Sequence, residues 1–259
     1  MWVYKGKNVK GTIVIVHGAG EHHGRYHWLI QRWVEHGYHV VIGDLPGQGY
    51  NISNRGYIKS YMDYVLEVER WIEKAHTLKR PTFIVAHSMG ALVTIEILMR
   101  KRMHVDGIVF SSPSLGIAKV SGKLVYHGAK IANLLAPTLQ VTTSITEELV
   151  TRNDEQLRKD AKDPFILSKV SVHWFRELVR MIKRANERAP EFPDIPLLIL
   201  QGGKDLVVDK QAVYHWFHKI PSTDKMYKEF KGLYHEVFNE PEKEEVFHYA
   251  RCFLEMHLP

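Results

Sequence analysis

The chain has 259 residues, of which 45% are hydrophobic, and this is enough to bury the core of one large α/β domain or of a domain with an inserted cap. Its formal net charge is +6, but the Lys and Arg residues are spread along the chain and no RNA- or DNA-binding motif is present, so we expect no nucleic acid partner. The single cysteine, Cys252, excludes an internal disulfide and a cysteine-based metal site. Its place in an apolar helical pattern predicts a buried thiol.

The first residues, Met1 to Lys7, include no apolar stretch long enough for a signal peptide. No run of about 18 apolar residues follows anywhere in the chain. We therefore expect a soluble, cytoplasmic protein. Its positive charge favours transient, peripheral contact with an anionic membrane surface.

Short apolar runs without alternation recur along the chain and predict β-strands. They lie at 12–16, 38–42, 83–86, 107–110 and 196–200. Such runs are typical of strands that are buried on both faces of a parallel sheet. Helical patterns lie between them, at 26–36, 61–76 and 91–102. This alternation predicts an α/β fold, with a mostly parallel, doubly wound central sheet flanked by helices.

Residues 82–92, Thr-Phe-Ile-Val-Ala-His-Ser-Met-Gly-Ala-Leu, form an apolar run that ends at Ser88 and turns at once into a helical pattern. This pattern is typical of a nucleophile elbow, Gly-x-Ser-x-Gly, with Ala86 at the first glycine position. The elbow would raise the Ser88 hydroxyl above the sheet and leave the Met89 N–H free to stabilise an oxyanion. The alternative is a tight strand-to-helix turn without catalytic function.

The alternation stops between residues 112 and 190, where helical patterns and turns occur without a convincing buried strand. We interpret 112–190 as an inserted helical cap, and 1–111 with 191–259 as the core. In the first cap helix, 117–136, one narrow stripe holds three lysines opposite an apolar face: Lys119, Lys123 and Lys130. We favour packing of that apolar face over the active site, with membrane contact as an addition.

A serine nucleophile needs a base, and the base needs an acid that orients it. After the cap, a strand at 196–200 precedes Asp205, and a second predicted strand, 225–231, precedes His235. In this class of fold the order along the chain is serine, acid, histidine. Ser88, Asp205 and His235 therefore form the predicted triad. Read singly, Asp205 could be a turn residue and His235 a surface histidine.

Other polar residues near the predicted strand ends have simpler interpretations. We expect Asp44 to cap the turn that follows it and Asp209 to cap the next helix. His87 should turn away from the pocket, because neighbouring residues in a strand point to opposite faces. The loop after the first buried strand, His17 to Glu21, supplies the second oxyanion donor, which we assign to the Ala19 N–H.

Five segments together resemble the monoacylglycerol lipase and lysophospholipase branch of the α/β-hydrolases. They are His17-Gly-Ala-Gly-Glu-His-His-Gly-Arg-Tyr26, Asp44-Leu-Pro-Gly-Gln-Gly49, the serine elbow, Gly-Gly-Lys-Asp205 and Leu-Tyr-His235. The resemblance implies a serine hydrolase of single-chain lipid esters with a lipid-facing cap. It also implies that Glu21 and Arg25 shape the end that receives glycerol. Two further departures are Leu45, where relatives often have histidine, and Phe238, at a position that can hold a glycerol-contacting histidine.

The resulting hypothesis is hydrolysis of monoacylglycerols through an acyl-enzyme on Ser88, with no metal or cofactor. The alternatives are a lysophospholipase or a general carboxylesterase. A peptidase or a cofactor-free haloperoxidase on the same fold fits less well. Outside enzymes, the alternative is a catalytically dead binding scaffold.

Overall fold

The computed structural model describes residues 1–101, 103–118, 136–142 and 147–259. Its main sheet has the strand order β1-β3-β2-β4-β5-β8-β9, in which β1 pairs antiparallel with β3 and the other neighbours pair in parallel. The predicted fold class is confirmed. The chain has an α/β-hydrolase fold, with a mostly parallel central sheet flanked by helices.

The strands of the main sheet are β1 (Trp2–Tyr4), β2 (Gly11–Val16), β3 (Tyr38–Ile42), β4 (Thr82–His87), β5 (Gly107–Ser111), β8 (Leu197–Gly202) and β9 (Lys225–Phe230). The helices are α1 (His27–Glu35), α2 (Met62–His76), α3 (Met89–Arg100), α5 (Glu147–Val150), α6 (Asp154–Asp160), α7 (Val172–Glu187), α8 (Lys210–Lys219) and α9 (Lys243–Met256). Short 3₁₀ turns lie at His23–Tyr26 and Ala189–Glu191.

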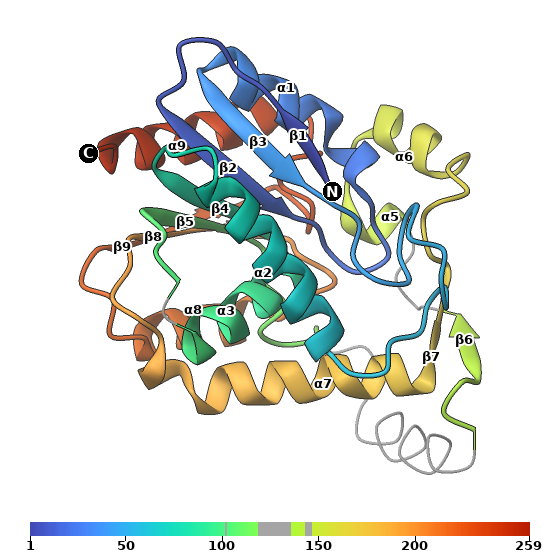
Figure 1. Ribbon diagram of the computed structural model, residues 1–259. Helices are drawn as coiled ribbons and strands as arrows, with labels where there is room; N and C mark the ends of the chain where they lie inside the picture. Colours follow the sequence, from blue (N-terminus) through green and yellow to red (C-terminus); the bar gives the residue numbers. More distant parts are fainter. Residues whose placement is uncertain (102, 119–135, 143–146) are drawn as a thin grey trace.

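Helices cover both faces of the sheet (Figure 1). The cluster of buried apolar residues on one face includes side chains from α1 and α9. The cluster on the other face includes side chains from α2, α3, α7 and α8. Because both faces are covered, the central strands β2, β4 and β5 are buried along their whole length, as their unalternating sequences predict.

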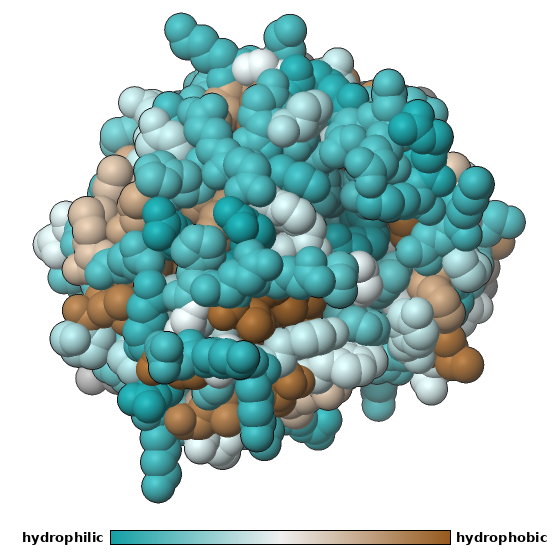
Figure 2. Space-filling model, turned by 90° about the horizontal axis from the view of Figure 1, so that it is seen from above, coloured by the Kyte–Doolittle hydropathy of each residue, from teal (hydrophilic) through white to brown (hydrophobic). Residues whose placement is uncertain are grey.

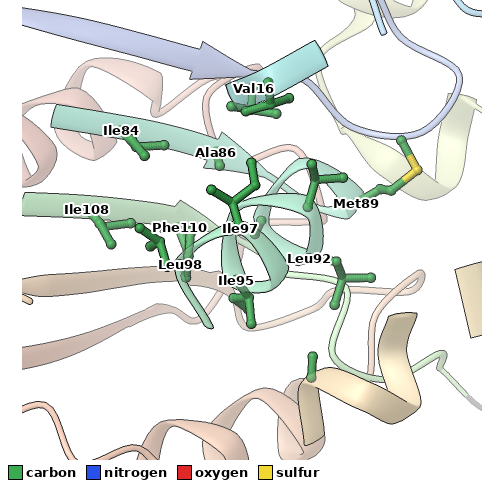
Figure 3. Packing of buried hydrophobic residues seen from close by; sticks show 14 of the residues in the cluster. Val16, Ile84, Ala86, Met89, Leu92, Ile95, Ile97, Leu98, Ile108 and Phe110 are labelled. Carbon is green, nitrogen blue, oxygen red and sulfur yellow. The ribbon is translucent and has the colours of Figure 1, made fainter. Parts of the chain in front are cut away.

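Helix α3, which follows the predicted elbow, is apolar on almost all sides. Ten of its residues, from Met89 to Leu98, are buried. Figure 3 shows its side chains beside Val16, Ala86 and Phe110, which lie on β2, β4 and β5. A helix that is apolar all round needs cover on every side. On the side away from the sheet, Glu96 forms an ion pair with Arg184 of α7.

The structure adds three strands that the sequence patterns did not predict. β1 extends the edge of the main sheet, and β6 (Gln140–Thr142) pairs antiparallel with β7 (Lys169–Ser171) inside the predicted cap. Each has only three residues, too few for a periodic pattern to be visible. Of the predicted basic helix, 119–135 lies outside the described residues, and the division into core and cap stays a prediction.

The expectation of a buried thiol at Cys252 is wrong, because this side chain is only partly buried. The face of α9 that packs inward holds Val246, Phe247, Ala250, Phe253 and Leu254. Cys252 lies beside that face, one helical turn from His248, and its sulfur is 3.5 Å from the His248 Nε2 atom.

Among the described residues we find no helix with the length and hydrophobicity needed to cross a membrane. The face of the molecule in Figure 2 is mostly hydrophilic, and its apolar residues gather in small patches between polar ones.

Candidate active site

Ser88 occupies the turn between β4 and α3 and has the strained backbone of a nucleophile elbow. Its φ is 50° and its ψ is −116°, in a region that residues with a side chain rarely adopt. The turn also needs Gly90, because a Cβ atom there would clash with the backbone carbonyl oxygen atoms of Val16 and His17. Ala86 lies within β4, paired with Val16 and Phe110, so the methyl group at the first glycine position is accommodated in the core.

The predicted base and acid lie beside Ser88. His235 Nε2 is 2.9 Å from Ser88 Oγ, and His235 Nδ1 is 2.8 Å from Asp205 Oδ2. Asp205 follows β8 and His235 follows β9, so parallel strands bring three residues together that are up to 147 positions apart in sequence. The other Asp205 oxygen accepts the N–H groups of Val207 and Val208. All three predicted residues therefore share one hydrogen-bonded chain.

The charges within this chain shift the pKa values of its members. Burial disfavours the charged form of His235, but the neighbouring Asp205 carboxylate outweighs burial and raises the pKa of His235 above its ordinary 6.5. Burial likewise opposes ionisation of Asp205, whose pKa is nevertheless lowered by His235 and the two N–H donors. Asp205 is therefore ionised at neutral pH and can orient the imidazole.

Two backbone amides near Ser88 were predicted to bind an oxyanion. Met89 is the first residue of α3, so its N–H has no acceptor within the helix. Ala19 lies in the loop after β2, and no described residue accepts a hydrogen bond from its N–H. This loop lies against the elbow, because a Cβ atom added at Gly18 would be 3.3 Å from Ser88 Cβ.

Arg25 and Glu21 belong to a buried network of charges. The Arg25 guanidinium donates to Glu21, to both oxygens of Asp160 on α6, and to both oxygens of Glu236. Glu21 also accepts the Tyr26 hydroxyl at 2.6 Å. Sequence reasoning missed Asp160 and Glu236. For Glu236 its position next to His235 was a signal, whereas nothing in the sequence connects Asp160 with Arg25.

This network holds more negative than positive charge, since three carboxylates surround one guanidinium. Burial opposes ionisation of both glutamates. For Glu21 the charge of Arg25 prevails, so its pKa is lowered. For Glu236, burial together with the negative Glu21 raises the pKa. Ligand atoms of Glu21, His87 and Glu236 lie within 4.8 Å of one another, a spacing that suits a metal ion, but Arg25 already spans the two carboxylates.

The expectation that His87 turns away from the pocket is wrong. Its ring lies 4.8 Å from the ring of His235, and it lines a small cavity together with Glu21, Arg25 and Glu236. The strand alternation that we used does not apply, because Ser88 is already in the turn and no longer has strand geometry. Burial lowers the pKa of His87 to about 4.

The two predicted caps are confirmed. Asp44 accepts the N–H groups of His23 and Tyr50 at 2.8 Å, and Asp209 accepts the N–H of Gln211 at the start of α8. Phe238, the departure near the proposed head-group end, lines the same small cavity as His87.

Residues 7–242 match the Hydrolase_4 family, described as serine aminopeptidase, S33. The chain belongs to this family. The hydrolase is 44% identical to the protein named phospholipase YtpA of Bacillus subtilis over 259 residues, which is 100% of both chains. It is 28% identical to a monoacylglycerol lipase of Mycolicibacterium smegmatis, over 96% of this chain and 89% of that protein.

A solved structure gives the same result. The monoacylglycerol lipase of Paleococcus ferrophilus superposes on the hydrolase with a TM-score of 0.87 at 29% identity, covering 98% of this chain and 99% of that one. The hydrolase is thus a carboxylic ester hydrolase of the monoacylglycerol lipase branch of the α/β-hydrolases, as the sequence motifs predicted.

Proposed function

We propose that this hydrolase cleaves monoacylglycerols to glycerol and a free fatty acid through an acyl-enzyme on Ser88. The observation that carries the proposal is the hydrogen-bonded chain from Ser88 through His235 to Asp205. A serine, a neutral imidazole and an ionised acid in this order are what acyl transfer at neutral pH needs.

In the first half of the reaction, Ser88 Oγ attacks the ester carbonyl carbon while His235 Nε2 takes the hydroxyl proton. The N–H groups of Ala19 and Met89 hold the negative oxygen of the tetrahedral intermediate. The bond to glycerol then breaks, and His235 returns the proton to the departing oxygen. In the second half, water gives its proton to His235, attacks the acyl carbon and releases the fatty acid, and Ser88 regains its proton.

The charges around the small cavity beside His87 support a neutral alcohol such as glycerol. Glu21, Arg25 and Glu236 line it, and with Asp160 behind them the carboxylates outnumber the guanidinium. Such a lining suits the hydroxyl groups of a neutral polyol and disfavours a phosphate, which would meet an excess of negative charge. Glu21 and Arg25 would act here mainly by shaping the cavity, since their polar atoms already bind one another and their neighbours.

We also propose that residues 112–190 act as the cap and make transient contact with a lipid surface. In the described part of this segment, Leu139, just before β6, and Val141, within β6, have exposed side chains. Ile52, which lies outside the segment in the loop before α2, is also exposed. Exposed apolar side chains on a basic protein suit the interface of an anionic membrane.

The second candidate is a lysophospholipase or phospholipase, which the 44% identity to the protein named phospholipase YtpA favours. Turnover of monoacylglycerols of increasing chain length, lysophosphatidylcholine, lysophosphatidylglycerol and short nitrophenyl esters separates the candidates. We expect the highest kcat/KM for a monoacylglycerol. A preference for either lysophospholipid would replace our proposal with the second candidate, and a preference for short esters would indicate a carboxylesterase.

Labelling with a fluorophosphonate tests whether the protein is an enzyme or a binding scaffold. We expect one adduct, on Ser88, in the folded wild-type protein. Failure to label Ser88 would support the scaffold.

A further inference from the structure

Three consecutive amides in the loop after β2 differ in their hydrogen bonds. Gly18 N–H donates to Glu21 Oε2 at 2.6 Å, and Gly20 N–H donates to Gln48 Oε1 at 2.6 Å. Between them, the N–H of Ala19 has no acceptor in the part of the chain that the structure describes. Two buried side chains therefore hold the peptide groups on either side of one free donor.

The orientation of the Gln48 side chain is fixed by its partners. An N–H can only donate, so the atom that faces Gly20 must be the carbonyl oxygen of Gln48. Its amide nitrogen donates to the hydroxyl of Tyr64 on α2 at 2.9 Å, and Trp174 Nε1 on α7 donates to the same hydroxyl at 2.7 Å. Gln48, Tyr64 and Trp174 are 1%, 1% and 4% exposed, so little water competes for these bonds.

The backbone on both sides of the contact is also constrained. Gln48 N–H donates to Leu45 O in a tight turn, and the flanking Gly47 and Gly49 have φ of 73° and 56°. Gly20 has φ of 80°, and its carbonyl oxygen accepts the N–H of Leu167. These bonds hold the two loops, but their glycines are conformationally permissive, so the loops can shift if the contact between Gly20 and Gln48 is lost.

We infer that Gln48 is a positioning residue, which fixes the Ala19 N–H as an oxyanion donor through its bond to Gly20. The inference rests on the proposed function, since it assigns the preorganisation of the oxyanion site that Ser88 would use. A donor held in place before the reaction costs no reorganisation when negative charge develops, and this is the origin of its catalytic effect. Tyr64 and Trp174 extend the same support to α2 and α7.

Gln48→Leu, which keeps the shape and removes the acceptor, tests the inference. Removing an oxyanion donor outright costs roughly 100- to 1000-fold in kcat, so misplacing one should cost roughly 10- to 100-fold, with KM little changed. Affinity for an alkyl boronic acid, which forms a tetrahedral adduct on serine, should fall with kcat. Gln48→Glu keeps an acceptor for Gly20, and the Tyr64 hydroxyl can donate to it. Its buried negative charge opposes a developing oxyanion, so this variant should recover only part of the loss.

Ile72→Ala is the matched control, because Ile72 is buried on the same helix as Tyr64, eight residues further along the chain. It should lower Tm and leave kcat unchanged. If Gln48→Leu does not fold, Tyr64→Phe and Gln48→Glu carry the test, and we expect Tyr64→Phe to lower kcat severalfold.

Wild-type kcat in Gln48→Leu, or in Tyr64→Phe where that variant carries the test, would overturn the inference. So would equal loss in Gln48→Leu and Gln48→Glu, or equal loss of kcat in Ile72→Ala. Labelling of wild-type Ser88 by a fluorophosphonate separates these failures from failure of the proposed function.

Discussion

Arg25 and Glu236 form a two-bond ion pair, with Nη1 to Oε1 and Nη2 to Oε2 both 2.9 Å apart. Glu236 is the residue after His235, and Arg25 also binds Glu21 in the loop that holds Ala19. One buried guanidinium therefore connects the two loops that carry the predicted base and the predicted oxyanion donor.

Replacing Arg25 with Ala should destabilise the fold by about 3–5 kcal/mol, because it leaves three buried carboxylates without their counter-ion. Arg25→Lys should recover little, since an ammonium group cannot make the paired bonds to Glu236 and Asp160. Urea unfolding measures both. Arg70→Ala is the control: Arg70 is 69% exposed in an ion pair with Glu67 and should cost less than about 1 kcal/mol. Equal losses at Arg25 and Arg70 would contradict the assigned role.

The rate should depend on pH through His235. Its raised pKa means that kcat/KM should increase with pH through an apparent pKa above 6.5, as the imidazole loses its proton and can act as a base. Asp205→Asn removes the largest of the charges that raise this pKa, while burial continues to lower it. The acidic limb of the profile should therefore move to lower pH while the maximal rate falls by about 10⁴-fold. An acidic limb at the same pH in both proteins would contradict the pairing of Asp205 with His235.

The contribution of His87 to the stability should fall as the pH decreases from 6.5 towards 4. The pKa of buried His87 is about 4 in the folded protein against 6.5 when exposed, so the unfolded state binds a proton that the folded state does not. Over this window, the titration of His87 alone should lower the free energy of unfolding by about 3 kcal/mol. The raised pKa of His235 does not compete here, since its contribution is complete below pH 6.5.

Urea unfolding at several pH values measures the slope of the unfolding free energy against pH. In His87→Gln, this slope between pH 6.5 and 5 should correspond to the uptake of nearly one proton fewer on unfolding than in the wild type. His104, which is 83% exposed, provides the control, and His104→Gln should keep the wild-type slope. An unchanged slope in His87→Gln would show that another group causes the loss.

Gly90→Ala should destabilise the protein by about 1–3 kcal/mol and slow labelling of Ser88. The added Cβ meets the carbonyl oxygens of Val16 and His17, and backbone atoms cannot move aside as a side chain can. Gly232→Ala, where the nearest atom is 4.0 Å away, should leave the stability within about 0.5 kcal/mol of wild type. Equal effects at both glycines would mean that the close approach of α3 to β2 is not needed.

The residues of the site that could be predicted from the sequence are those that lie at the ends of strands. Ser88, Asp205 and His235 each follow a parallel strand, and the register of the sheet brings such positions to one edge. Asp160 and Gln48 could not be found in this way. Asp160 meets Arg25 only because α6 packs against the loop after β2, and Gln48 meets Gly20 because two loops touch. His87 was misjudged because the turn at Ser88 ends the strand geometry one residue earlier than we assumed.

The turnover of a monoacylglycerol by Ser88→Ala tests the central claim most directly. The variant should keep the wild-type Tm and lose at least about 10³-fold in kcat, because no other group replaces the attacking hydroxyl. Full turnover by folded Ser88→Ala would contradict the assignment of Ser88 as the nucleophile.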